Sequence, residues 1–402
     1  MSQAHHHVLL VVLLVAAMAP LVNELPIRLR LPLVVLELLF GIAVGPQGLD
    51  LVQAEGSLRT LSALGLSFLF FLAGMDLDFS TLRGRPLNLG GAGWLVSLTL
   101  ALALSYGLHE AGMVADPLLV SVALATTAIG TLLPILREAG ELETGFGRYV
   151  LGAGAIGEFA PIILFSLIVT GDDGFAMRSG LLLTFVFIAL ACAGLALRLR
   201  PPPVIALLAR TLHGTSQLPV RLSMLLLGGM VVLADVFGLN LLLGAFAAGA
   251  LVGLVAPGPD AEPFRHKLDA LGFGFLIPIF FVVSGTQIDI AALVASPDSL
   301  ARVPLFLLLL LVVRGAPALL YRRALGGRDR LVLALYSATS LPLIVVIAGI
   351  GKAAGRMLPE TAAALVGAGI LSVLIFPLMA LTLRARGPKP SAAQREAGAG
   401  PT

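Results

Sequence analysis

Long apolar segments run through almost the whole chain. Thirteen of them have about the length, 17 to 25 residues, that an α-helix needs to cross a bilayer. They lie near residues 6–22, 31–45, 57–75, 87–108, 115–136, 147–170, 179–197, 218–236, 240–256, 268–287, 303–321, 331–350 and 358–383. Hydrophobic residues make up 58% of the 402 positions and charged residues only 12%, which leaves more apolar surface than a soluble fold of this length buries. The chain is therefore predicted to fold in a lipid bilayer.

The kind of membrane fold follows from the hydrogen bonds that the backbone needs. In lipid, only helices and closed barrels satisfy all of their own backbone groups, and barrel strands are short with alternating polarity. The segments here are long continuous runs rich in Leu, Ala and Val. We therefore predict an all-α membrane protein with about thirteen transmembrane helices.

Basic residues sort to one side of this predicted topology, as they do in membrane proteins whose cytoplasmic loops hold the excess of Lys and Arg. With thirteen spans, twenty basic residues fall on the side reached after the first span. The five on the other side are Arg59, Arg178, Arg302, Lys352 and Arg356. The sorting predicts a multi-pass protein of the cell (inner) membrane, with the N-terminus outside and the C-terminus in the cytoplasm.

Composition also argues against several functions. A formal net charge of +3 is too small to suggest a nucleic-acid partner. The single cysteine, Cys192, lies in an apolar stretch, so the chain has no internal disulfide and no cysteine metal cluster. His109, His213 and His266 fall in loops or at span ends, and no His, Ser and Cys constellation lies at a common depth. We expect neither an enzyme nor a bound cofactor.

The chain shows signs of an internal repeat inside one transmembrane domain, residues 1–385. Offsets of 211 or 208 residues bring three pairs together: Gly74 with Gly285, Asp78 with Asp289, and Gly41 with Gly249. Seven spans separate the two copies, and an odd number gives them opposite directions through the membrane, as in the inverted repeats of secondary transporters. The copies are predicted at about 31–170 and 240–383, followed by a disordered cytoplasmic tail at 386–402, which is rich in Gly, Pro, Ala and Ser.

The same offset aligns two unusual polar segments inside apolar spans. The fifth span contains ALATTAIGTLLP, with Thr126 and Thr127, and the twelfth contains YSATSLPL, with Ser337, Thr339 and Ser340. Hydroxyl residues beside a mid-span Gly or Pro are typical of discontinuous helices, whose unwound carbonyls and half-helix ends coordinate ions. The alternative is a pair of kinked helices whose hydroxyls bond back to their own carbonyls. For a symmetric pair we predict two discontinuous helices that cross.

Three ionisable side chains, Glu37, Glu158 and Arg314, lie well inside apolar spans. A charge at the bilayer centre costs at least about 2.5–3.5 kcal/mol, so each needs a partner, a water-filled cavity or a changed protonation state. Glu158 lies about 15 Å along its helix from Arg148, near mid-membrane. Such residues are candidates for ion pathways.

Glu158 is the predicted carrier, with Na+ or K+ bound at its carboxylate. A buried carboxylate holds either a proton or a desolvated alkali cation, so competition produces exchange when access alternates between the two sides. The alternative is a structural ion pair. Arg314 cannot be neutralised; Glu158 and broken-helix carbonyls are its candidate partners, and it would stabilise the ion-free site. For Glu37 a packing or interface role is at least as well supported as transport.

These segments resemble the cation:proton antiporter superfamily, in the branch of bacterial potassium-efflux and sodium/proton antiporters. The resemblance covers residues 25–385 and rests on LELLFGIAVGPQGL, GLSFLFFLAGMDLD, the TTA of the fifth span, RYVLGAGAIGEF and Arg314, in this order. It implies a thirteen-helix or twelve-plus-one-helix sodium/proton antiporter fold, with crossed unwound helices in spans five and twelve. It further implies a homodimer in which a core domain moves against a scaffold, and an ion-carrying acidic residue on the sixth span.

The chain departs from this pattern just before the proposed carrier. Many relatives have paired polar or acidic residues ending in Asp at this point, whereas this chain has Gly157 followed by Glu158. Without a first acidic residue, we expect electroneutral exchange of one cation, Na+ or K+, for one H+.

Two other transport classes stay open at the level of sequence. A cation channel has similar broken helices, but it needs no titrating carboxylate, and its flux is not coupled to protons. A sodium-coupled symporter of organic anions on a related fold would require more polar residues along its site than this chain provides.

Overall fold

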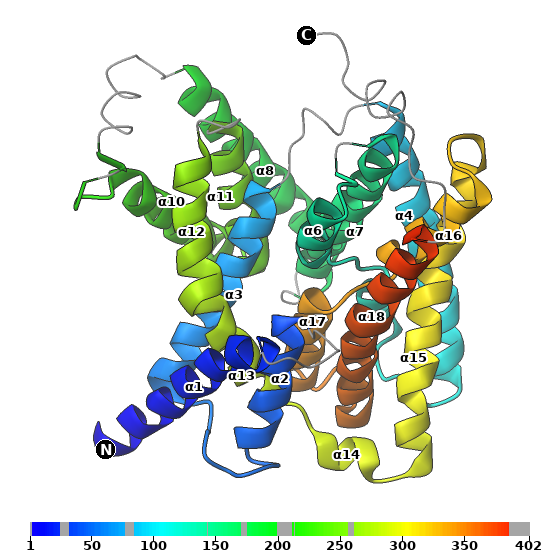
Figure 1. Cartoon of the computed structure of the whole chain (residues 1–402), viewed down its shortest axis with the longest axis horizontal. Helices are drawn as coiled ribbons and strands as arrows, with labels where there is room; N and C mark the ends of the chain where they lie inside the picture. The colour runs from blue at the N-terminus through cyan, green and yellow to red at the C-terminus, as the bar shows by residue number, and fades with distance from the viewer. Residues whose placement is uncertain are drawn as a thin grey trace. The chain divides into compact units, whose positions relative to one another are not determined.

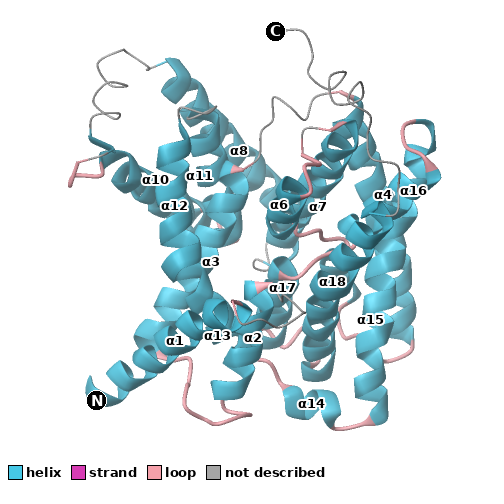
Figure 2. Ribbon diagram, in the orientation of Figure 1, coloured by secondary structure: helices cyan, strands magenta, loops and turns pink. Residues whose placement is uncertain are grey.

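The computed structural model describes residues 2–24, 32–76, 84–142, 144–169, 175–198, 211–212, 214–255 and 261–385. Throughout these residues the regular structure is helical and contains no strand (Figure 2). The predicted tail at 386–402, His213 and Asp78 lie outside the described residues. The boundaries of the predicted transmembrane domain therefore stay a prediction.

The chain divides into two compact units. The first consists of residues 1–27, 36–78 and 165–286, and the second of 28–35, 79–164 and 287–402. Described helices of the first unit are α1 (Ser2–Asn23), most of α2 (Leu33–Val44), α3 (Gly56–Met75), α8 (Phe175–Arg198), α10 (Leu218–Val236), α11 (Leu241–Val255), α12 (Glu262–Leu271), a π-helical segment (Gly272–Leu276) and α13 (Ile277–Thr286).

The second unit holds the C-terminal third of the chain together with four earlier helices. Its described helices are α4 (Arg85–Glu110), α5 (Pro117–Leu124), α6 (Ile129–Glu138), α7 (Gly145–Val169, as far as Leu164), α14 (Ile290–Val294), α15 (Pro297–Gly315), a 3₁₀ helix (Ala316–Arg323), α16 (Gly327–Ser337), α17 (Pro342–Ala353) and α18 (Pro359–Ala385). Within this unit α15 and α18 pack side by side (Figure 1).

Each predicted span falls on one helix or on consecutive helices of the structure. Eight described helical segments are long and apolar enough to cross a membrane, and five further apolar helices are shorter. The chain is thus an all-α, multi-pass membrane protein. How many helices cross the bilayer, and in which orientation, stays a prediction.

Bare glycines bring two pairs of helices of the first unit into backbone contact. A Cβ added to Gly74 of α3 would meet the Phe246 carbonyl of α11, and one added to Gly249 of α11 would meet the Phe71 carbonyl of α3. Gly41 of α2 and Gly285 of α13 approach each other in the same way. Small residues allow such close approach in membranes, where lipid provides no hydrophobic drive between helices. In the predicted inverted repeat, α2 corresponds to α11 and α3 corresponds to α13. The contact of α3 with α11 is then the counterpart of the contact of α13 with α2. The repeat itself stays a prediction.

In the second unit a mixed aliphatic and aromatic core joins α6, α7, α16 and α18. It includes Leu132, Val150, Tyr336 and Phe376, all buried. At the edge of this core, Arg384 of α18 forms ion pairs with Asp329 (2.7 Å) and Glu141 (2.8 Å) and stacks on the Phe146 ring at 3.9 Å from its centroid. These contacts fix the outer ends of α6 and α16, whose inner ends form the candidate site.

Candidate functional site

Two helices of the second unit are interrupted in mid-course, as the sequence predicts. The first break, residues 125–128, separates α5 from α6, and the second, residues 338–341, separates α16 from α17. Pro342 explains the second break, because proline suits the first position of a helix and disfavours helical geometry in the residue before it. Leu341, with φ −147° and ψ −56°, lies outside the helical region. The prediction of two discontinuous helices is confirmed.

The two breaks cross and hold each other by hydrogen bonds. The Ala128 N–H donates to the Thr339 carbonyl at 2.8 Å, and the Thr127 hydroxyl donates to the Ser337 carbonyl at 2.5 Å. The hydroxyls of Thr126 and Ser340 are also hydrogen-bonded to each other. All five side chains that the sequence singled out here are buried. The alternative of back-bonding holds in part, since Thr339 donates to the Leu335 carbonyl of its own helix at 3.1 Å and Thr126 to the Ala123 carbonyl at 2.7 Å.

Arg314, in the last turn of α15, reaches into this crossing and is only 3% exposed. Its Nε and Nη2 atoms donate to the Thr127 hydroxyl at 3.0 and 2.7 Å, and its Nη1 donates to the Ser97 hydroxyl at 3.0 Å. Longer bonds of 3.4 Å run to the carbonyls of Ser337 and Ala153. The guanidinium thus lies at the C-terminal end of α16, where the helix dipole favours a positive charge.

Helix α7 closes the crossing on another side. The Thr127 N–H donates to the Gly157 carbonyl at 2.9 Å. A Cβ added to Gly157 would meet Nη2 of Arg314, and it would lie 2.8 Å from the Thr127 hydroxyl oxygen. Glu158 is the next residue along α7, and its side chain is partly exposed. The structure therefore brings the backbone before Glu158 into contact with both Thr127 and Arg314.

Glu37, the third intramembrane charge, is not among these residues. It lies on α2, in the first unit, and is 5% exposed. It lies one turn before Gly41 on α2, and Gly41 packs against α13. This position fits the packing interpretation of Glu37.

Sequence reasoning missed three polar residues that support the crossing. Ser97 of α4 links Arg314 Nη1 to the Val313 carbonyl, to which its hydroxyl donates at 2.9 Å. The Ser372 hydroxyl of α18 accepts from the Ser340 N–H at 3.1 Å and lies 2.9 Å from the Ser340 carbonyl. The Trp94 ring N–H donates to the Ala125 carbonyl at 3.2 Å. Single serines in apolar spans are too common to stand out, although Trp94 is the only tryptophan of the chain.

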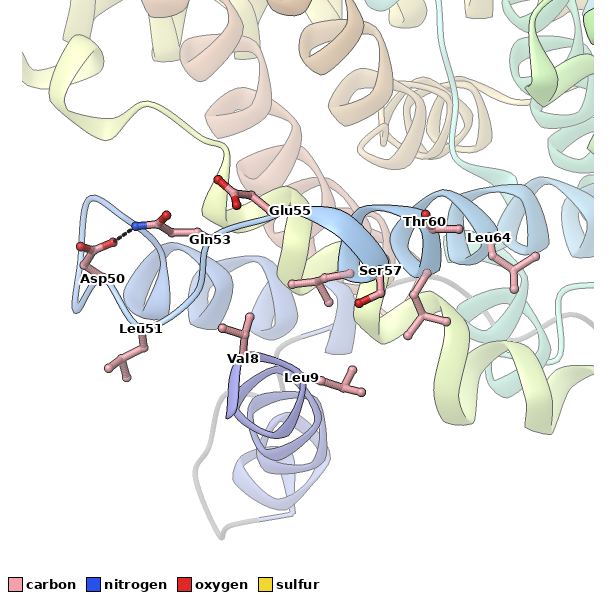
Figure 3. Close-up of a pocket in the computed structure, with 11 residues that line it drawn as sticks. Val8, Leu9, Asp50, Leu51, Gln53, Glu55, Ser57, Thr60 and Leu64 are labelled. Carbon is pink, nitrogen blue, oxygen red and sulfur yellow. Dashed lines mark hydrogen bonds between the residues drawn. The ribbon is translucent and has the colours of Figure 1, made fainter. Parts of the chain in front are cut away.

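A surface groove of about 620 Å³ lies elsewhere, in the first unit (Figure 3). Val8 and Leu9 of α1 form one wall, Leu61 and Leu64 of α3 another, and a polar end carries Asp50, Gln53 and Glu55. None of the residues of the crossing lines it. The candidate site is recognised by its buried polar contacts.

Two discontinuous helices that cross within an apolar bundle define the class of the fold, that of membrane transporters built on broken helices. The family described as "Sodium/hydrogen exchanger, transmembrane" matches residues 12–381. The chain belongs to this family. Its relatives in the family are transporters.

The proteins similar to the chain include two curated relatives and one solved structure. The "Putative Na(+)/H(+) antiporter YjbQ" of Bacillus subtilis is 29% identical over 95% of the chain and 64% of its own length. The "Glutathione-regulated potassium-efflux system protein KefC" of Salmonella typhimurium is 28% identical over 94% of the chain and 60% of its own length. The sodium proton antiporter MjNhaP1 of Methanocaldococcus jannaschii has the same fold, with a TM-score of 0.64, 17% identity and coverage of 95% of this chain and 98% of that one.

The chain spans less than two thirds of the length of both curated relatives. The family match confirms the resemblance to the cation:proton antiporter superfamily, and the likeness to the solved structure confirms the all-helical antiporter fold.

Proposed function

We propose that this chain exchanges a monovalent cation, Na+ or K+, for H+ across the membrane, with Glu158 as the shared binding group. The observation that carries the proposal is the crossing of two broken helices against the backbone that precedes Glu158. The names of the similar proteins agree with it, since YjbQ and MjNhaP1 are named as sodium/proton antiporters and KefC as a potassium-efflux protein.

The chemistry of the crossing suits a cation that has lost its water. Broken helices leave carbonyl and hydroxyl oxygens at membrane depth, and a carboxylate beside them supplies the negative charge. Thr126, Thr127, Ser337, Thr339 and Ser340 provide such oxygens. When a proton binds to the carboxylate, the cation loses the negative charge that the carboxylate supplied, and it leaves.

Arg314 stabilises the site when no cation is bound. Its positive charge faces the carbonyl end of α16 and the Thr127 hydroxyl, so these groups keep a partner while no cation is bound. Gly157 adds no second titratable group, and we therefore infer that one cation moves per proton. The exchange is then electroneutral.

Orientation and assembly belong to the same proposal. The excess of basic residues on one side supports an inner-membrane protein with its N-terminus outside and its C-terminus in the cytoplasm. A homodimer in the lipid bilayer is the assembly that the resemblance implies.

The test is proton movement in proteoliposomes that contain the purified protein and a pH-sensitive dye. A pulse of Na+ or K+ is expected to dissipate a preset proton gradient with the wild type but not with Glu158→Gln. Glu37→Gln is the matched control, because it removes the other intramembrane carboxyl and is expected to keep the response. Equal responses of wild type and Glu158→Gln would place the coupling group elsewhere, and cation flux without proton movement would support a channel.

A further inference from the structure

One turn of α7 presents bare backbone to the guanidinium of Arg314. Nη2 of Arg314 donates to the Ala153 carbonyl at 3.4 Å, and Gly157, four residues later, lies on the same face of the helix. The Cβ position of Gly157 is occupied by three neighbours: Nη2 of Arg314, the Thr127 hydroxyl oxygen at 2.8 Å and the Thr127 Cβ at 2.9 Å. The space that any other residue would fill with its side chain is already taken.

None of these neighbours gives way easily. The guanidinium is almost fully buried, and the partner atoms that hold it come from α4, α7, α16 and the first break. Thr127 lies in the break itself, where its N–H is bound to the Gly157 carbonyl and its hydroxyl to the Ser337 carbonyl. Contacts below 3.0 Å with such fixed groups force a shift of the break or of the arginine.

We propose that Gly157 is a positioning residue. Because it has no side chain, Arg314 and Thr127 can meet at its Cβ position, directly beside Glu158. The inference rests on the proposed function in so far as it concerns transport. A side chain at 157 pushes the guanidinium off Thr127 and moves the oxygens of the first break relative to Glu158. The glycine thus sets the geometry of the cation site, in addition to leaving it with a single carboxyl.

Transport kinetics separate this role from ordinary packing. A packing defect lowers the amount of active protein, and hence the maximal rate, but leaves the apparent KM for the cation unchanged. Displaced site oxygens raise the apparent KM. For Gly157→Ala we expect an apparent KM for Na+ or K+ about tenfold higher than that of the wild type, the size typical of coupling between residues in contact.

Gly130→Ala is the matched control. Gly130 lies on α6, close to the same break, and a Cβ added there meets nothing within 4 Å. The substitution is chemically identical and lies three residues from Thr127. An apparent KM within about twofold of the wild type is expected for it.

Arg314→Lys provides the rescue. Lysine has no atom in the place of Nη2, so the closest of the three contacts disappears. In the Arg314→Lys background, we expect Gly157→Ala to change the apparent KM by about threefold or less. Equal ratios in the two backgrounds would overturn the proposal, because Gly157 would then not act through Arg314.

A transport-free measurement keeps the inference testable if the wild type exchanges no cation. The thermal unfolding temperatures of four detergent-purified proteins, the wild type, Gly157→Ala, Arg314→Lys and the double variant, form the same cycle. Gly157→Ala is expected to lower the unfolding temperature more in the wild-type background than in the Arg314→Lys background. If Gly157→Ala gives no monodisperse protein, recovery by Arg314→Lys supports the proposal, and failure to recover overturns it. Absence of exchange in the wild type, with the thermal coupling intact, refutes the proposed function alone.

Discussion

The two units use apolar helices of similar composition in opposite ways. In the first unit, α3 and α11 are continuous, and bare glycines press their backbones together at Gly74 and Gly249. In the second unit, two helices are interrupted, and their breaks meet through hydroxyls and backbone groups around Arg314. Both arrangements bring chain segments close together, but only the second leaves polar groups that need a partner from outside their own helix.

The difference shows where ion chemistry can arise in a bilayer. A continuous helix satisfies its own N–H and carbonyl groups and offers none of them to a ligand. A broken helix frees several such groups at membrane depth, and they must be met by side chains or ions. The contact of α3 with α11 in the first unit is therefore held by shape, whereas the crossing in the second unit depends on the buried charge of Arg314.

The largest effect that this comparison predicts comes from Arg314→Gln. The substitution removes the charged guanidinium that donates three hydrogen bonds of 3.0 Å or less. A hydrogen bond with a charged donor contributes about 1.5–3 kcal/mol. We expect a loss of about 3–5 kcal/mol in the free energy of unfolding, together with loss of exchange. Thermal unfolding of the purified protein measures the first, and an unchanged unfolding temperature would mean that the crossing does not depend on the arginine.

A smaller effect is expected from Gly249→Ala in the first unit. The added methyl group meets the Phe71 carbonyl and lies 2.9 Å from the Met75 nitrogen, so α3 and α11 must separate. Overpacking of this kind costs about 1–3 kcal/mol. The apparent KM of exchange should stay that of the wild type, because only shape is disturbed.

Gly228→Ala in α10 is the control for this prediction, since nothing lies within 4 Å of its Cβ position and alanine favours a helix. A changed KM in Gly249→Ala with an unchanged unfolding temperature would contradict the division of roles between the two units.

The smallest effect concerns the second break. Ser372→Ala removes the hydroxyl that accepts from the Ser340 N–H, at an expected cost of about 1–2 kcal/mol in the free energy of unfolding. Ser105→Ala is its control, because the buried Ser105 hydroxyl of α4 has no hydrogen-bond partner among the described residues. Thermal unfolding should rank Ser372→Ala below Ser105→Ala, which is expected to equal or exceed the wild type. The reverse order would show that Ser372 does not support the break.

Much of the site was visible in the sequence because membrane burial makes polar residues conspicuous. A threonine pair and a Ser-Ala-Thr-Ser-Leu-Pro run inside apolar spans predicted both breaks, and the structure confirms them. Glu158 and Arg314 stood out for the same reason. Their roles in transport stay predictions that the experiments above address.

The sequence by itself determined the helical class, the positions of the breaks and the candidate charges, because each depends on local composition and on proline geometry. The tertiary structure alone decided the partners. Thr127 and Arg314 are 187 residues apart, and Ser97 and Arg314 are 217 apart, so no local pattern records that they meet. Only the packed structure shows that the guanidinium of Arg314 occupies the space beside Gly157. Close packing depends on which segments the fold brings together.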